Sequence, residues 1–132
     1  MIISLSLKSK NLEYQSETWK RQLAFLLGEN IHVKDQISLV LTEPLQFAIV
    51  EELDNFQTEV VSNDKQIITI QKEIEEFDHL AKSNSTDDGY SRKAMLYFIK
   101  NIQKQIDKTE RTSSNIQKRF NDFLHDLDPA AS

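Results

Sequence analysis

The chain has 132 residues, of which 28% are charged and 39% hydrophobic, and its formal net charge is −5. This length suits one domain. Two glycines and two prolines are too few for a β-sandwich or barrel, which needs a turn every ~8–12 residues, and the absence of cysteine excludes a disulfide framework or a thiolate metal site. The negative net charge argues against polyanion binding by the chain as a whole.

Residues 1–9 lack the composition of a secretion signal or a membrane anchor. They are apolar but short, without a basic start or a small-residue cleavage site. No stretch of the chain approaches the ~18–20 apolar residues that span a bilayer. We therefore expect a soluble cytoplasmic protein that does not bind membranes, with residues 1–9 as an N-terminal tail that either forms a short strand or folds onto helices.

Apolar residues recur at alternating steps of four and three from Leu12 to Val40, which is the spacing of a helix that packs along one seam. The phase continues unchanged through Gly28, although glycine costs a helix interior ~1 kcal/mol relative to alanine. This spacing predicts one unbroken helix from about residue 10 to about residue 42.

From Pro44 onward, the spacing of the first helix falls mostly on polar residues, and a new row of apolar residues starts at Ile49. A shift of phase indicates a chain reversal, with Thr42 as the N-cap of the second helix and Pro44 in its first turn. The alternative is one helix kinked at Pro44. The second row predicts a helix over about 44–82.

A polar segment follows the second helix, and a third row of apolar residues at the same spacing predicts a helix over about 88–126. Three long helices of matched length favour an all-α, antiparallel three-helix coiled-coil bundle with up-down-up topology. The bundle forms one domain over 10–128, with a C-terminal tail over 129–132. In length and helix count alone the pattern resembles the three-helix units of spectrin-type repeats, and no residue role follows from that resemblance.

Four seam positions in the middle of the predicted bundle are polar: Asn30, Asn63, Thr109 and Ser113. Counting outward from the two reversals places Asn63 opposite Thr109, and Asn30 near Phe56 and Ser113. A buried asparagine specifies helix register at a cost in stability, because any slip leaves its amide unpaired. We predict polar core layers here; a small-molecule slot is the alternative.

The sequence offers no catalytic, cofactor or metal site. The histidines, His32, His79 and His125, stand too far apart for a ligand pair on one helix, and Glu29 with His32 is an isolated pair. No phosphate-binding glycine loop, nucleophile motif or calcium loop is present. We therefore expect a non-enzymatic protein without cofactors.

A second apolar stripe lies away from the seam of the first helix, at Ala24, Phe25, Gly28, Ile31 and Leu39. Small residues allow close approach, and exposed large apolar residues indicate a covered patch. We predict that this stripe binds another protein chain or a second copy in a homodimer. In the alternative interpretation, the N-terminal tail covers it.

The second and third helices carry opposite charge. Residues 44–82 contain nine acidic and three basic residues, a net charge of −6, whereas residues 91–119 contain eight basic and two acidic residues, a net charge of +6. Opposed charges help to set helix pairing. The overall prediction is an interaction or scaffolding module. The alternatives are a ligand-responsive regulator with a polar mid-core slot, and a nucleic-acid adaptor that uses the basic face of the third helix.

Overall fold

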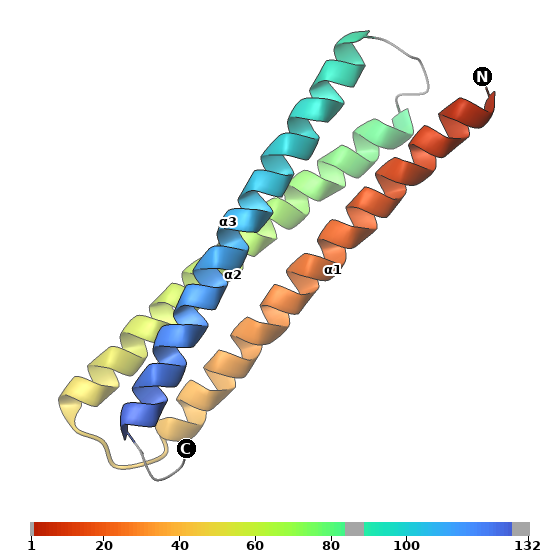
Figure 1. Ribbon diagram of the computed structural model, residues 1–132. Helices are drawn as coiled ribbons and strands as arrows, with labels where there is room; N and C mark the ends of the chain where they lie inside the picture. The colour runs from red at the N-terminus through yellow and green to blue at the C-terminus, as the bar shows by residue number, and fades with distance from the viewer. Residues whose placement is uncertain (1, 84–88, 128–132) are drawn as a thin grey trace.

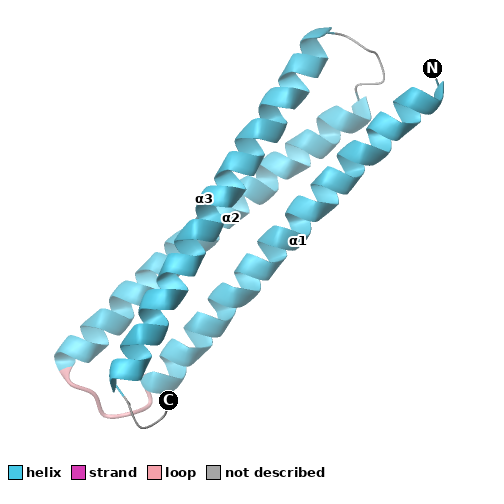
Figure 2. Cartoon of the chain, in the orientation of Figure 1, coloured by secondary structure: helices cyan, strands magenta, loops and turns pink. Residues whose placement is uncertain are grey.

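The structure, a computed structural model, describes the backbone of residues 2–83 and 89–127 and the side chains of residues 11–82 and 92–127. The chain forms three α-helices, α1 (Ile2–Val40), α2 (Phe47–Ser83) and α3 (Gly89–Leu127), and no strand occurs within these ranges. Each helix runs opposite to the preceding one, and all three pack together (Figures 1 and 2). The predicted all-α three-helix bundle is confirmed.

The helix α1 begins at Ile2 rather than near residue 10. Residues 2–9, which were predicted to be a tail, continue the helix, so they neither form a strand nor fold back over α1. They contain no glycine or proline, and extending an existing helix gains one hydrogen bond for each residue fixed. The predicted C-terminal tail lies outside the described residues.

Gly28 does not interrupt α1, as the continuous seam predicts. Gly28 is exposed, and a Cβ atom built on it would meet nothing within 4 Å. The glycine is therefore not required by packing within the bundle. Without a side chain at Gly28, the outer side of α1 is open at this position.

The first reversal occurs at the predicted place but with different capping. Thr42 Oγ1 donates a hydrogen bond to the Leu39 carbonyl oxygen at 2.6 Å, so Thr42 closes the end of α1 and is not the N-cap of α2. The backbone N–H groups of Ile49 and Val50 instead bond to the Gln46 carbonyl oxygen. The residue before a proline is driven to extended backbone. For that reason the chain around Pro44 forms a loop, and α2 begins at Phe47 instead of residue 44.

The core consists of two clusters of buried apolar residues, one toward each end of the bundle. The first contains Trp19, Leu23, Leu26, Ile67, Ile70, Ile74, Phe77, Ile102 and Ile106. The second, near the α1–α2 loop, contains Val33, Ile37, Leu53, Phe56, Val60, Ile116 and Phe120. Full burial of one such side chain contributes about 1.5–3 kcal/mol, so these clusters supply the main driving force for folding.

Aromatic contacts join the helices inside each cluster. Trp19 of α1 meets Phe77 of α2 edge-on, with ring centroids 5.2 Å apart, and its Nε1 donates to Gln103 Oε1 of α3 at 3.0 Å. Phe56 of α2 meets Phe120 of α3 edge-on at 5.3 Å. Edge-on pairs at these distances are favourable beyond the area that they bury. Each cluster is therefore held by a specific aromatic contact as well as by burial.

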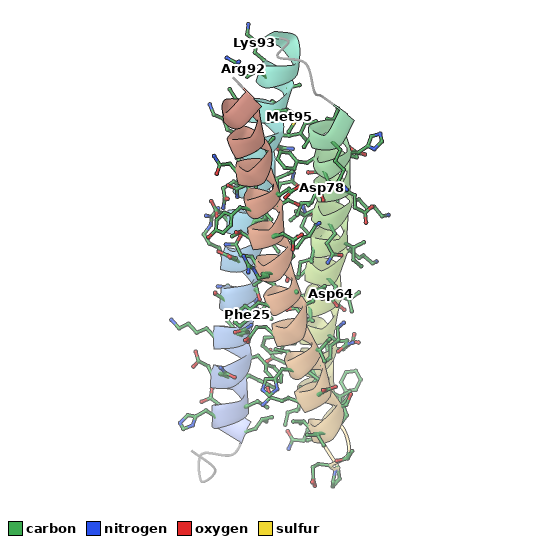
Figure 3. The ribbon with its side chains drawn as sticks, turned by 90° about the vertical axis from the view of Figure 1, so that its right-hand side faces the viewer. Phe25, Asp64, Asp78, Arg92, Lys93 and Met95 are labelled. Atoms are coloured by element: carbon green, nitrogen blue, oxygen red, sulfur yellow. The ribbon has the colours of Figure 1, made fainter. Side chains whose placement is uncertain are left out.

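The first turns of α3 extend past the ends of the other two helices. Figure 3 places Arg92 and Lys93 beyond the described ends of α1 and α2, whereas Met95 lies at their level. Met95 packs against the first cluster and is partly buried. The apolar seam of α3 thus begins where the neighbouring helices begin to cover it.

Candidate functional site

A layer of polar side chains separates the two core clusters. It consists of the four residues predicted to form polar core layers, Asn30, Asn63, Thr109 and Ser113, and each of them is buried. All three helices contribute to it. Because buried polar groups need partners, this layer constrains how the helices align more strongly than the apolar clusters do.

The centre of the polar layer is a hydrogen-bonded group between α1 and α2. Asn30 Nδ2 donates to Asn63 Oδ1 at 2.9 Å and to Asp64 Oδ1 at 2.8 Å. Lys34 of α1 forms an ion pair with the other carboxylate oxygen of Asp64. This four-residue group, which we call the α1–α2 latch, satisfies both amide hydrogens of Asn30.

The partner predicted for Asn30 was wrong. Asn30 lies level with Asn63 and not with Phe56, which is one heptad earlier in α2. The count from the reversal assumed that α1 and α2 end level with each other, and the extended loop around Pro44 removes that constraint. Sequence reasoning also missed Lys34 and Asp64. The sequence signal that could have found them is their position beside the seam, close to the buried amides of Asn30 and Asn63.

Thr109 carries a buried hydroxyl that lacks a hydrogen-bond partner within the described part of the chain. It borders a surface hollow between α2 and α3, which Asn63 also lines. The sequence predicts that Asn63 and Thr109 face one another across α2 and α3, and both residues line this one hollow. Ser113 Oγ accepts a hydrogen bond from Gln117 Nε2 at 3.4 Å. Thr109 is thus the one member of the layer whose polar atom has no such bond.

The stripe predicted on α1 lies on the outside of the bundle. Its large apolar members are well exposed: Phe25 by 66%, Ile31 by 56% and Leu39 by 70%. Ala24 and Gly28 are also exposed. Figure 3 shows Phe25 in the second half of α1, near the level of Asp64 in the α1–α2 latch. We call these five residues the outer α1 face; Tyr14, also exposed, extends it and was missed by sequence reasoning.

Charged contacts between helices are made at the bundle surface. Arg119 of α3 binds both carboxylate oxygens of Glu59 of α2, at 3.1 and 2.6 Å, and its guanidinium lies 5.7 Å from the Phe56 ring centre. Bonding to Glu59 raises the pKa of Arg119 above its ordinary value. The opposite charges of α2 and α3 therefore meet at this pair. Half-exposed pairs of this kind contribute well under ~1 kcal/mol each.

Acidic residues of α2 also face α1. Lys20 Nζ lies 2.9 Å from Asp78 Oδ2, and this hydrogen bond is the main reason that the pKa of Lys20 is raised above its ordinary value. Lys34 and Asp64 form another cross-helix ion pair between α1 and α2. The negative charge of α2 is thus shared between both neighbours, and not directed to α3 alone.

The basic residues of α3 form an exposed row at Lys100, Lys104, Lys108 and Arg111. A row of cations is the minimum requirement for binding a phosphate backbone. Asp107 and Glu110 lie between these cations on the same helix. No exposed aromatic side chain interleaves this stretch, which single-strand binding would require for stacking. Apart from this row of cations, the geometry gives no support for nucleic-acid binding.

Within the described residues, no group of three or more His, Asp or Glu side chains gathers closely enough to hold a metal ion. None of the described helices is both long enough and apolar enough to cross a membrane. Comparison with known proteins gives no match to a family model, a curated protein or a solved structure. The function is therefore inferred from the geometry of this chain alone.

Proposed function

We propose that the protein is a non-enzymatic interaction module that binds a second protein chain through the outer α1 face. The observation that carries this proposal is the exposure of Phe25, Ile31 and Leu39 on one side of a helix whose other side already fills the core. Neither core cluster includes these three side chains. Exposed apolar residues gathered in this way are typical of a surface that a partner covers.

The partner that suits this surface is an amphipathic helix. The outer α1 face is a straight strip along one long helix, with Gly28 and Ala24 allowing a partner backbone to approach and Phe25 and Ile31 standing on either side. A second helix with apolar residues at helical spacing fills such a strip by the packing that joins helices within a bundle. We further propose that the protein acts in the cytoplasm as a rigid scaffold.

Site-specific photo-crosslinking in the native cells tests this function. A photoreactive phenylalanine analogue replaces Phe25 in one variant, and Tyr97 of α3 in the control variant. Tyr97 is a matched control because it is an aromatic residue exposed to a similar degree, 70% against 66%. We expect a protein adduct of defined mass from position 25, none from position 97, and loss of the adduct when Ile31→Glu is added.

Equal adducts from positions 25 and 97, or none from either, would overturn the proposed function. An adduct that survives Ile31→Glu would also count against it, because it would show contact without use of the apolar strip. Circular dichroism of each variant checks that the bundle remains helical. Phe25, Ile31 and Tyr97 are exposed and outside both clusters, so these changes leave the core intact.

A small-ligand site beside Thr109 is a second candidate function. The buried Thr109 hydroxyl, which has no partner among the described residues, borders the hollow that Asn63 also lines, and one hydrogen-bonding group of a ligand would satisfy it. A crystal structure of the protein purified from its native cells tests this candidate. Ordered density larger than water between Asn63 and Thr109 supports it, and water alone contradicts it.

A further inference from the structure

The side of α1 that bears the outer α1 face also carries two charged residues placed symmetrically about Gly28. Arg21 and Asp35 lie seven residues before and after Gly28, which is two helical turns on each side. All three residues are exposed and lie along one line of α1. A strip with a cation at one end, an anion at the other and a glycine at its centre is complementary to itself when one copy is reversed.

We infer that the second chain is another copy of this protein, and that two α1 helices pack antiparallel across a two-fold axis at Gly28. The inference rests on the proposed function and names its partner. Arg21 of each copy then lies opposite Asp35 of the other, so the arrangement forms two equivalent ion pairs. Such self-complementary pairing is what a two-fold interface requires.

The parallel arrangement is disfavoured by the same residues. Two parallel α1 helices in register would bring Arg21 against Arg21 and Asp35 against Asp35. Like charges placed opposite each other across an interface are unfavourable and suppress that mode of association. The charges of α1 therefore select the antiparallel orientation in addition to contributing attraction.

Gly28 is suited to the point where the two helices come closest. Packed helices have axes ~8–10 Å apart, and the Cα atoms lie ~2.3 Å from each axis, which leaves about 3.4–5.4 Å between facing Cα atoms. Two facing glycines tolerate that separation. Since a Cβ at Gly28 would meet nothing in the bundle itself, packing within one copy does not account for the glycine.

Apolar residues flank the glycine contact on both sides. In the antiparallel arrangement, Phe25 lies beside His32 of the second copy on one flank, and Ala24 lies beside Ile31 on the other. The strip therefore places its charges along the centre line and its largest apolar groups at the flanks. Association covers the exposed Phe25 and Ile31 side chains, which is the favourable burial expected to drive it.

Single-cysteine crosslinking tests the position of the two-fold axis, because the chain contains no cysteine of its own. In the antiparallel dimer only residue 28 faces itself, so Gly28→Cys should form a disulfide-linked dimer on mild oxidation, whereas Tyr14→Cys, at an exposed position two heptads earlier on the same line of α1, should not. A parallel dimer would link both variants. Linkage of Tyr14→Cys to an equal extent, or of neither variant, overturns the inferred geometry.

Charge reversal tests the pairing without cysteine. We expect Arg21→Asp and Asp35→Arg each to raise the dimer Kd by about tenfold or more, because each replaces two attractive contacts with two repulsive ones. The double variant restores both pairs and should return the Kd to near the wild-type value. Failure of the double variant to recover overturns the inferred pairing of Arg21 with Asp35.

The outcomes separate this inference from the proposed function. A wild-type protein that remains monomeric while position 25 still crosslinks to another protein refutes self-association and leaves the interaction module standing. A monomeric protein without any adduct at position 25 refutes both. A dimer whose Kd is unaffected by either charge reversal forms through another surface. That result refutes the inference, and self-association then no longer supports the outer α1 face as a binding surface.

Discussion

Replacing the two asparagines of the α1–α2 latch measures what the polar layer contributes. In Asn63→Leu, burial of a leucine gains about 1.5–3 kcal/mol, while the Asn30 N–H that loses its acceptor costs about 1–3 kcal/mol. The hollow beside Asn63 accommodates the larger side chain. We therefore expect the free energy of unfolding of this single variant to stay within about 1 kcal/mol of the wild-type value.

Adding Asn30→Val should change this balance. Valine is close to asparagine in volume, which suits the enclosed Asn30 site, and Asp64 keeps its ion pair with Lys34. No amide is then left without a partner. Burial of two apolar side chains raises the free energy of unfolding, and the loss of two hydrogen bonds lowers it by ~1 kcal/mol net each. The expected result is a stabilisation of about 2 kcal/mol. For a chain of this size, that raises the Tm by roughly 6–10 °C.

Urea unfolding followed by circular dichroism gives these free energies, and the double-mutant cycle isolates the coupling between Asn30 and Asn63. We also expect broader amide resonances in the double variant, because an apolar layer no longer penalises a slip by one heptad. A double variant that is less stable than the wild type by more than about 2 kcal/mol would refute the reasoning. In that case the latch would be a source of stability and not of register.

Three further predictions concern single side chains. Thr109→Val should raise the unfolding free energy by about 1 kcal/mol, because it removes a buried hydroxyl without a partner; a loss measured by urea unfolding contradicts this. Gly28→Ala should stabilise the monomer by up to about 1 kcal/mol, since its Cβ meets nothing, while weakening self-association in sedimentation equilibrium. Lys20→Met should cost no more than about 1 kcal/mol at neutral pH. The Asp78 carboxylate raises the pKa of Lys20. The extra free energy of unfolding of the wild type over Lys20→Met is therefore present below the ordinary lysine pKa and disappears as the pH rises through the raised value. A difference in unfolding free energy that does not change with pH contradicts the pairing of Lys20 with Asp78.

The spacing of apolar residues predicted which side of each helix is buried. Leu23, Ile70 and Ile106 lie on the predicted seams and are buried in one cluster, because the 3–4 spacing places such residues on one helix face wherever the helix ends. The exposure of Phe25 and Leu39 is explained by the same rule. Burial in a helical bundle is thus set locally, by position within the turn.

The relative height of neighbouring helices could not be predicted in this way. The pairing of Asn30 with Asn63 depends on the loop around Pro44 and on how Lys34 and Asp64 meet, and neither is encoded in a repeat. The early start of α1 was missed because residues 1–9 were interpreted as a short apolar tail and not as a continuation of the helix. Helix ends depend on single capping interactions, such as the bond from Thr42 to Leu39, that spacing does not report.

Sedimentation equilibrium over a range of protein concentrations tests the central claim, that the outer α1 face pairs with itself, most directly. The wild-type mass should rise from 15.4 kDa toward twice that value with concentration, and Tyr97→Glu should behave in the same way. Phe25→Glu, which places a charge in the covered strip, should remain at 15.4 kDa throughout. A wild-type protein that stays at 15.4 kDa at every concentration would contradict the account.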